Sequence, residues 1–94
     1  MKNNIVGRYY KRKTSDGEYA VYKIIGFNGR YYISVHYYFS IGYAMKDNHH
    51  LLQKTFYNSP YFSEISELEF SIAKNLYKDS GRFECNNDKN FRRV

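Results

Sequence analysis

The chain has 94 residues and is 43% hydrophobic, which is enough for one modest core and too little for two domains. Aromatic residues make up 20% of it, which excludes a disordered chain, because disordered chains are poor in rings. No apolar run reaches the roughly 18 residues of a transmembrane helix. The formal net charge of +6 would attract nucleic acid or an acidic protein surface.

The sequence also bears on location. The single cysteine, Cys85, excludes an internal disulfide and fits a reducing compartment. The first residues, MKNNIVGRYYKRK, lack the apolar core of a signal peptide, so a cytoplasmic location is expected. The abundance of Lys, Asn, Ile, Tyr and Phe, which A/T-rich codons encode, indicates an AT-rich bacterium or its phage.

The N-terminal half predicts an antiparallel meander. Residues 5–13, 18–27 and 31–41 are rich in β-branched and aromatic residues and read as three strands, with the turn sequence TSDG after the first. Asn28-Gly29 lies between the second and third strands. This pair predicts a type I′ hairpin, because both central residues of that turn need a positive φ.

A two-residue Asn28-Gly29 loop would set the register of this hairpin. Ile24 would then lie opposite Ile33 and Tyr22 opposite Val35 on the core face. The other face would collect the odd residues of the second strand and the even residues of the third. An even-numbered loop in the first hairpin adds Arg8, Tyr10 and Arg12 to this second face, whereas a three-residue loop would reverse that strand.

Residues 42–58 are the least regular part of the sequence. Residues 42–50, GYAMKDNHH, look like a loop, and residues 51–58, LLQKTFYN, fit a short fourth strand better than a helical turn. Ser59-Pro60 predicts the start of a helix, because a serine cap followed by proline suits a helix N-terminus. Ser63 and Ser66 are competing starts.

The helix is expected to run from Pro60 to Asp79 and to be amphipathic. Its buried stripe is predicted from residues spaced three and four apart, with further apolar residues widening it. The expected stripe is Ile65, Leu68, Ile72 and Leu76, widened by Phe70, Ala73 and Tyr77.

These elements predict an α+β fold over residues 1–81. A small twisted antiparallel sheet of three to five strands, able to curl into a half-barrel, would carry the helix on one face. Residues 82–94 are predicted to be a polar, basic and mobile tail. An open sheet edge would offer a route to a homodimer.

The sequence carries no recognisable catalytic or metal-binding pattern. His36, His49 and His50 have only Asp47 and Cys85 as nearby candidate ligands, and no C-x₂-C or H-E-x-x-H spacing occurs. The histidine pair is expected in a solvated loop. The acidic residues do not form a nucleophile–base or paired-carboxylate pattern. We therefore expect no enzyme, no cofactor and no metal site.

The second sheet face supports a binding function instead. Nucleic-acid platforms combine stacking rings with cations that hold phosphates, and the sequence therefore predicts a small basic phage or bacterial accessory protein that binds nucleic acid or a nucleoprotein. Because Tyr and Arg also dominate protein interfaces, the alternative is an anti-defence or anti-CRISPR-like inhibitor of a host or defence enzyme. A third interpretation is that residues 42–58 cover this face and bury its rings. The candidate binding residues are Arg8, Tyr10, Arg12, Lys23, Arg30, Tyr32, His36 and Tyr38.

Overall fold

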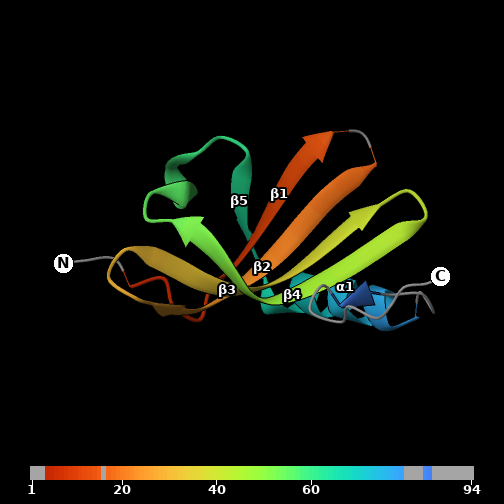
Figure 1. Ribbon diagram of the computed structural model, residues 1–94. Helices are drawn as coiled ribbons and strands as arrows, with labels where there is room; N and C mark the ends of the chain where they lie inside the picture. Colours follow the sequence, from red (N-terminus) through yellow and green to blue (C-terminus); the bar gives the residue numbers. More distant parts are fainter. Residues whose placement is uncertain (1–3, 16, 80–83, 86–94) are drawn as a thin grey trace.

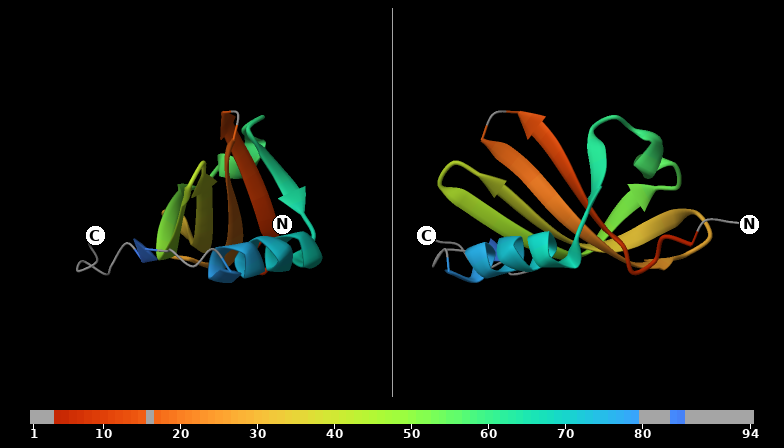
Figure 2. Two further views of the ribbon diagram at one scale, coloured as in Figure 1. Left: turned by 90° about the vertical axis from the view of Figure 1, so that its right-hand side faces the viewer. Right: turned by 180° about the vertical axis from the view of Figure 1, so that it is seen from behind.

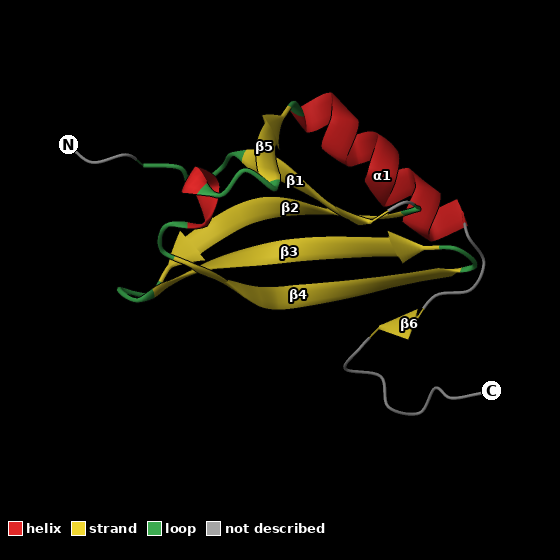
Figure 3. Ribbon diagram, turned by 90° about the horizontal axis from the view of Figure 1, so that it is seen from above, coloured by secondary structure: helices red, strands yellow, loops and turns green. Residues whose placement is uncertain are grey.

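The computed structural model describes residues 4–15, 17–79 and 84–85. The chain folds into one sheet with the strand order β5-β1-β2-β3-β4-β6, in which β1 to β5 pair antiparallel and β6 runs parallel to β4 (Figures 1 and 3). The predicted α+β fold is confirmed. In chain order the elements are β1 (Tyr9–Ser15), β2 (Glu18–Phe27), β3 (Tyr31–Ser40), β4 (Tyr43–Gln53), the 3₁₀ helix η1 (Phe56–Asn58), β5 (Phe62–Ile65), α1 (Glu67–Asp79) and β6 (Glu84–Cys85).

The sheet is open, because its outer strands β5 and β6 do not pair with each other. Its strands fan out above α1, as the two side views show (Figure 2). We call the face that carries α1 the helix face and the opposite one the far face. The helix-face core joins Phe70, Ala73 and Tyr77 of α1 to Val21, Tyr37 and Ala44 of the sheet.

The far face has a core of its own, which explains why the strands carry tyrosines on both sides. Phe56 of η1 packs there together with residues from four strands and from the segment before β1. Both sheet faces are therefore packed, and each needs its own set of rings. The buried residues of this core are Ile5, Tyr10, Ala20, Tyr22, Ile24, Tyr32, Leu52 and Phe56.

The register between β2 and β3 differs from the predicted one. Tyr22 lies opposite His36, and Ile24 lies opposite Ser34. A β-bulge at Ile25, between Ile24 and Gly26, adds one residue to β2 and shifts the pairing. As a result, the even-numbered residues of β2 up to Ile24 share the far face with the even-numbered residues of β3, so the predicted separation of Tyr22 from His36 is wrong.

The hairpin turn itself is also displaced by one residue. Gly29 has φ +97°, and no non-glycine residue in the described ranges has a positive φ, so a type I′ turn centred on Asn28-Gly29 is excluded. Asn28 instead stands before the turn. Its backbone N–H donates to the carbonyl of Tyr31, and its Oδ1 accepts hydrogen bonds from the backbone N–H groups of Arg30 and Tyr31 at 2.9 and 2.8 Å.

Two predicted boundaries after β3 need correction. The loop expected over residues 42–50 is wrong, because β4 runs without interruption from Tyr43 to Gln53; the strand predicted at its end is confirmed for residues 51–53. The helix does not begin at Pro60, because residues 62–65 form β5 and pair with β1. It begins after Ser66, whose Oγ accepts a hydrogen bond from the N–H of Glu69 at 3.1 Å.

The predicted buried stripe of α1 is wrong for its three central leucine and isoleucine positions, whereas the predicted flanking residues Phe70, Ala73 and Tyr77 are buried. Leu68, Ile72 and Leu76 are 69%, 53% and 51% exposed. The side of α1 that faces the sheet consists instead of Phe70, Ala73 and Tyr77. The reason is ring packing, since Phe70 and Tyr77 both contact Tyr37, at centroid distances of 5.6 and 5.2 Å. The outer side of α1 therefore presents aliphatic side chains to solvent.

The C-terminal segment is described only at Glu84–Cys85, whose backbone pairs with Met45 and Lys46 of β4. The rest of the predicted mobile tail, residues 82–83 and 86–94, lies outside the described residues. Within the described part of the chain, no helix is both long enough and apolar enough to cross a membrane.

Candidate functional site

The structure divides the eight predicted binding residues between different surfaces. Lys23 lies on the helix face, with its Nζ 5.9 Å from the ring centroid of Tyr9. Arg30 lies in the β2–β3 turn, and Arg8 precedes β1 and pairs with Glu64 at 3.6 Å in an exposed contact. The remaining five residues share the far face: Tyr10, Arg12, Tyr32, His36 and Tyr38.

Most of the rings in this set are packed and not presented to solvent. Tyr10 and Tyr32 are buried, and both meet Phe56 edge to face, at centroid distances of 5.0 and 5.9 Å. Tyr38 is half-buried. Phe56 covers this face in the way that the third interpretation of the sequence expects. The binding role of the eight residues stays a prediction.

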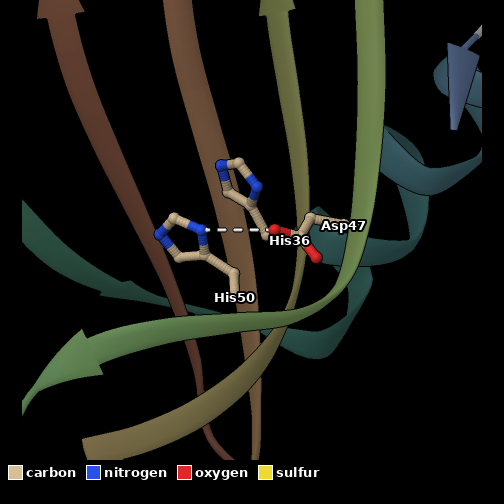
Figure 4. A group of neighbouring side chains, drawn as sticks. All are labelled: His36, Asp47 and His50. Atoms are coloured by element: carbon tan, nitrogen blue, oxygen red, sulfur yellow. Dashed lines mark ion pairs between the residues drawn. The ribbon is translucent and has the colours of Figure 1, made fainter. Parts of the chain in front are cut away.

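A group of three polar side chains lies beside this core, where β3 and β4 pair. His36 lies opposite Asp47, and Ser34 lies opposite His50, so β4 contains one residue more than β3 over this interval. In a regular strand, Asp47 and His50 would point to opposite faces, because side chains alternate with a period of two. The extra residue places both on the far face (Figure 4).

The three side chains are close enough to act together. A ligand atom from each of His36, Asp47 and His50 lies within 4.8 Å of the others. The two imidazole rings stack, with a centroid distance of 4.2 Å and an interplanar angle of 20°. His50 Nδ1 lies 3.7 Å from Asp47 Oδ2, while Asp47 Oδ1 accepts a hydrogen bond from the N–H of His49 at 3.0 Å.

Burial favours the neutral form of both imidazoles. Desolvation lowers the pKa of His36 to about 4; protonation of His50 and the charge of Arg12 lower this pKa further, whereas Asp47 raises it. Desolvation likewise lowers the pKa of His50, against the upward influence of Asp47. The His50–Asp47 contact is an ion pair only when His50 is protonated, which its lowered pKa opposes.

One atom of this group has no partner. His36 is 6% exposed, and its Nδ1 is buried without a hydrogen-bond partner among the described residues. Such an atom is unusual in a protein interior, because the desolvated group costs about 1–3 kcal/mol. The His36–Asp47–His50 group is therefore the candidate site on the far face.

The sequence could not reveal this group. The only visible signal was Asp47 three residues before His50, and that spacing on a strand normally separates two side chains. The β4 bulge and the pairing of His36 with Asp47 are properties of the folded sheet. The loop expected at His49-His50 is wrong because both residues lie in β4, although His49 is exposed as expected.

The outer side of α1 is the second surface with functional potential. A groove of about 190 Å³ runs between the helix and the β1–β2 part of the sheet. Lys11 and Glu69 form an ion pair of 3.7 Å at this groove. Its lining residues are Lys11, Tyr19, Val21, Glu69, Ile72, Ala73 and Leu76.

Comparisons of the chain with protein-family models, with curated proteins and with solved structures give no match. What the chain does is therefore inferred from its own residues.

Proposed function

We propose that this chain is a non-enzymatic binding protein that docks an acidic protein partner on the outer side of α1. The observation that carries the proposal is the outer stripe, Leu68, Ile72 and Leu76, whose side chains are all more than half exposed on consecutive turns. Exposed apolar residues are common singly, but a contiguous set is typical of an interaction surface.

The groove beside the outer stripe supports the same function. Ile72 and Leu76 form one wall, and Tyr19 and Val21 of β2 contribute from the sheet. An apolar side chain of a partner could insert there, as buried anchors do at protein interfaces. The Lys11–Glu69 pair supplies polar groups at the same groove.

Charge selects the kind of partner. The whole chain carries 15 basic and nine acidic residues, so its net field attracts an acidic protein at long range and accelerates encounter with it. Within α1 itself the charges nearly balance, with three acidic and two basic residues, so the attraction comes from the rest of the chain. A second copy carries the same charge of +6 and is repelled at long range. An acidic protein is therefore favoured over self-association.

The nucleic-acid interpretation is less well supported than the protein one. It relies on exposed rings for stacking, and Tyr10 and Tyr32 are buried against Phe56. The aliphatic side chains of the outer stripe suit a protein surface better than a base stack. Nucleic-acid binding is the competing outcome of the test.

The test places a photo-crosslinking residue at Ile72 and, as the control, at exposed Lys54 between β4 and η1. The captured protein is purified and titrated with the wild type and with a Leu68→Ser, Ile72→Ser double variant. We expect an acidic partner whose Kd weakens at least about tenfold in the double variant and is unchanged by Lys54→Ala.

Two results would overturn the proposal. One is a cross-link from position 72 only to a second copy of the chain. The other is tight binding of labelled DNA or RNA that falls steeply between about 50 and 200 mM salt and is unaffected by the double variant.

A further inference from the structure

We propose that His36, Asp47 and His50 form a binding site for a divalent transition-metal ion of the zinc type, with a fourth coordination position left open. This site lies on the far face and does not depend on the outer stripe of α1. Its ligands are two imidazoles and one carboxylate from the neighbouring strands β3 and β4 (Figure 4).

The donor set selects the class of metal. Imidazole nitrogen suits Zn²⁺, Co²⁺, Ni²⁺ and Cu²⁺, whereas Mg²⁺ and Ca²⁺ prefer sites made of oxygen alone. Two histidines with one carboxylate also occur in zinc sites with three protein ligands, where water fills the remaining position. The chemistry of the three side chains therefore favours a zinc-type ion.

The distances are compatible with such an ion after a small movement. Ligand atoms of a tetrahedral site, each about 2.1 Å from the metal, lie roughly 3.4 Å apart. The three side chains offer atoms within 4.8 Å of one another. Closing the difference of about 1.4 Å also requires the two imidazoles to rotate out of their stack, because each ring binds a metal in its own plane.

The unpartnered nitrogen gives the second, independent observation. His36 is more than nine-tenths buried, and its Nδ1 has no hydrogen-bond partner in the described ranges. Coordination would give this atom a partner. The pair of hydrogen bonds nearby also suits a metal site, since the His49 N–H holds the Asp47 carboxylate and Ser34 Oγ donates to the His50 carbonyl.

Arg12 is a cation near this group of side chains. Its guanidinium lies over the ring of Phe62, 5.8 Å from the centroid, and its charge acts on both His36 and His50. The positive charge of Arg12 repels a bound cation, and the negative carboxylate of Asp47 offsets this repulsion. Metal affinity therefore depends on that carboxylate. The charge of Arg12 also favours a negatively charged fourth ligand, such as hydroxide, over a neutral one.

The test uses the full chain without an affinity tag, in a Cys85→Ser background that removes the thiol as a competing ligand. After chelator treatment and its removal, the protein is titrated calorimetrically with ZnCl₂ and followed by visible absorption with CoCl₂. We expect one equivalent of zinc at micromolar or tighter Kd, absorption bands of low-symmetry Co²⁺, and a higher Tm with zinc but not with MgCl₂.

Matched variants locate the ion. His50→Ala and Asp47→Asn should each weaken zinc binding at least about tenfold, with far-UV circular dichroism confirming that both remain folded. His49→Ala changes the exposed neighbour of the site and should bind zinc like the parent. Absence of stoichiometric zinc binding, or an equal loss in His49→Ala and His50→Ala, would overturn the proposal.

Discussion

His36 illustrates how a single residue can be shaped by its surroundings. Its ring contacts those of Tyr22 and His50, at centroid distances of 4.9 and 4.2 Å, and almost all of its surface is buried. Water cannot solvate an imidazolium there, so the neutral ring is the form that the folded protein holds. Stability and proton binding are therefore linked at this residue.

The sign of that linkage predicts acid sensitivity. The pKa of His36 is about 4 in the folded chain and about 6.5 when unfolded, so between these values the unfolded chain binds more protons. The stability that the folded chain gains by keeping His36 neutral is fully present above about pH 6.5. It is lost as the pH falls toward 4, which lowers the free energy of unfolding by up to roughly 3 kcal/mol. Urea unfolding in the presence of EDTA, measured from pH 7.5 to 4.5, should show that the free energy of unfolding decreases.

The control for this prediction is His36→Phe, which keeps a ring of similar shape and has no proton to gain. Its free energy of unfolding should depend less on pH than that of the wild type over the same range. Parallel curves for the two proteins would contradict the assignment, because the acid sensitivity would then belong to other groups.

At the scale of elements, α1 shows that spacing alone does not decide which side of a helix is buried. Two apolar sets share the helix, and either could serve as its inner side by periodicity. The aromatic set prevails because Phe70 also contacts Tyr9, at a centroid distance of 5.1 Å, in addition to Tyr37. The aliphatic set therefore lies on the solvent-exposed side of α1.

Paired substitutions in α1 measure this difference. Ile72→Asp should leave the domain folded and change the free energy of unfolding by less than about 1 kcal/mol, because the side chain is exposed. Phe70→Ala should cost about 3–5 kcal/mol, since it opens a cavity beneath the helix. Thermal melts of both variants check the prediction, and a greater loss in Ile72→Asp would contradict the orientation of α1.

The start of α1 gives a second test at this scale. Ser66→Ala removes the side-chain acceptor of the Glu69 N–H and should cost about 1 kcal/mol. Ser71→Ala, in the body of the same helix, removes no such cap and should be close to neutral, because alanine is the better helix former. Chemical denaturation distinguishes them, and equal effects would mean that Ser66 does not cap the helix.

Much of this fold could be predicted from the sequence, and the misses have physical causes. The β-branched and aromatic residues of β2 and β3 predicted both strands, because such side chains pack well on a pleated surface. Composition of this kind could not reveal the bulge at Ile25, since one extra residue changes the pairing without changing composition. Likewise, the grouping of His36 with Asp47 and His50 depends on tertiary pairing, so the candidate metal site was not visible in the sequence.

At the scale of the whole molecule, the two cores share one sheet. Val21 belongs to the helix-face core and its neighbours Ala20 and Tyr22 to the far-face core, so β2 supports both. If either core came apart, one face of β2 would become exposed to water while its other face still belonged to the remaining core. The domain should therefore behave as one cooperative unit.

Unfolding followed by two probes tests this cooperativity. Far-UV circular dichroism and tyrosine fluorescence should give coincident urea transitions for the wild type. Tyr22→Ala on the far face and Tyr37→Ala on the helix face should each move both transitions together to lower urea. A variant that separates the two curves would show that the cores unfold independently.

The extra residue in β4 also carries a genetic consequence. Deleting the codon of Asn48 or His49 would remove the extra residue and leave Asp47 and His50 two positions apart, a spacing at which the side chains of a regular strand share a face. The three side chains would then still meet on the far face, without a bulge. A change that kept both residues but imposed regular pairing on β4 would instead turn Asp47 and His50 to opposite faces, so the group depends on the length of this strand as well as on its three side chains.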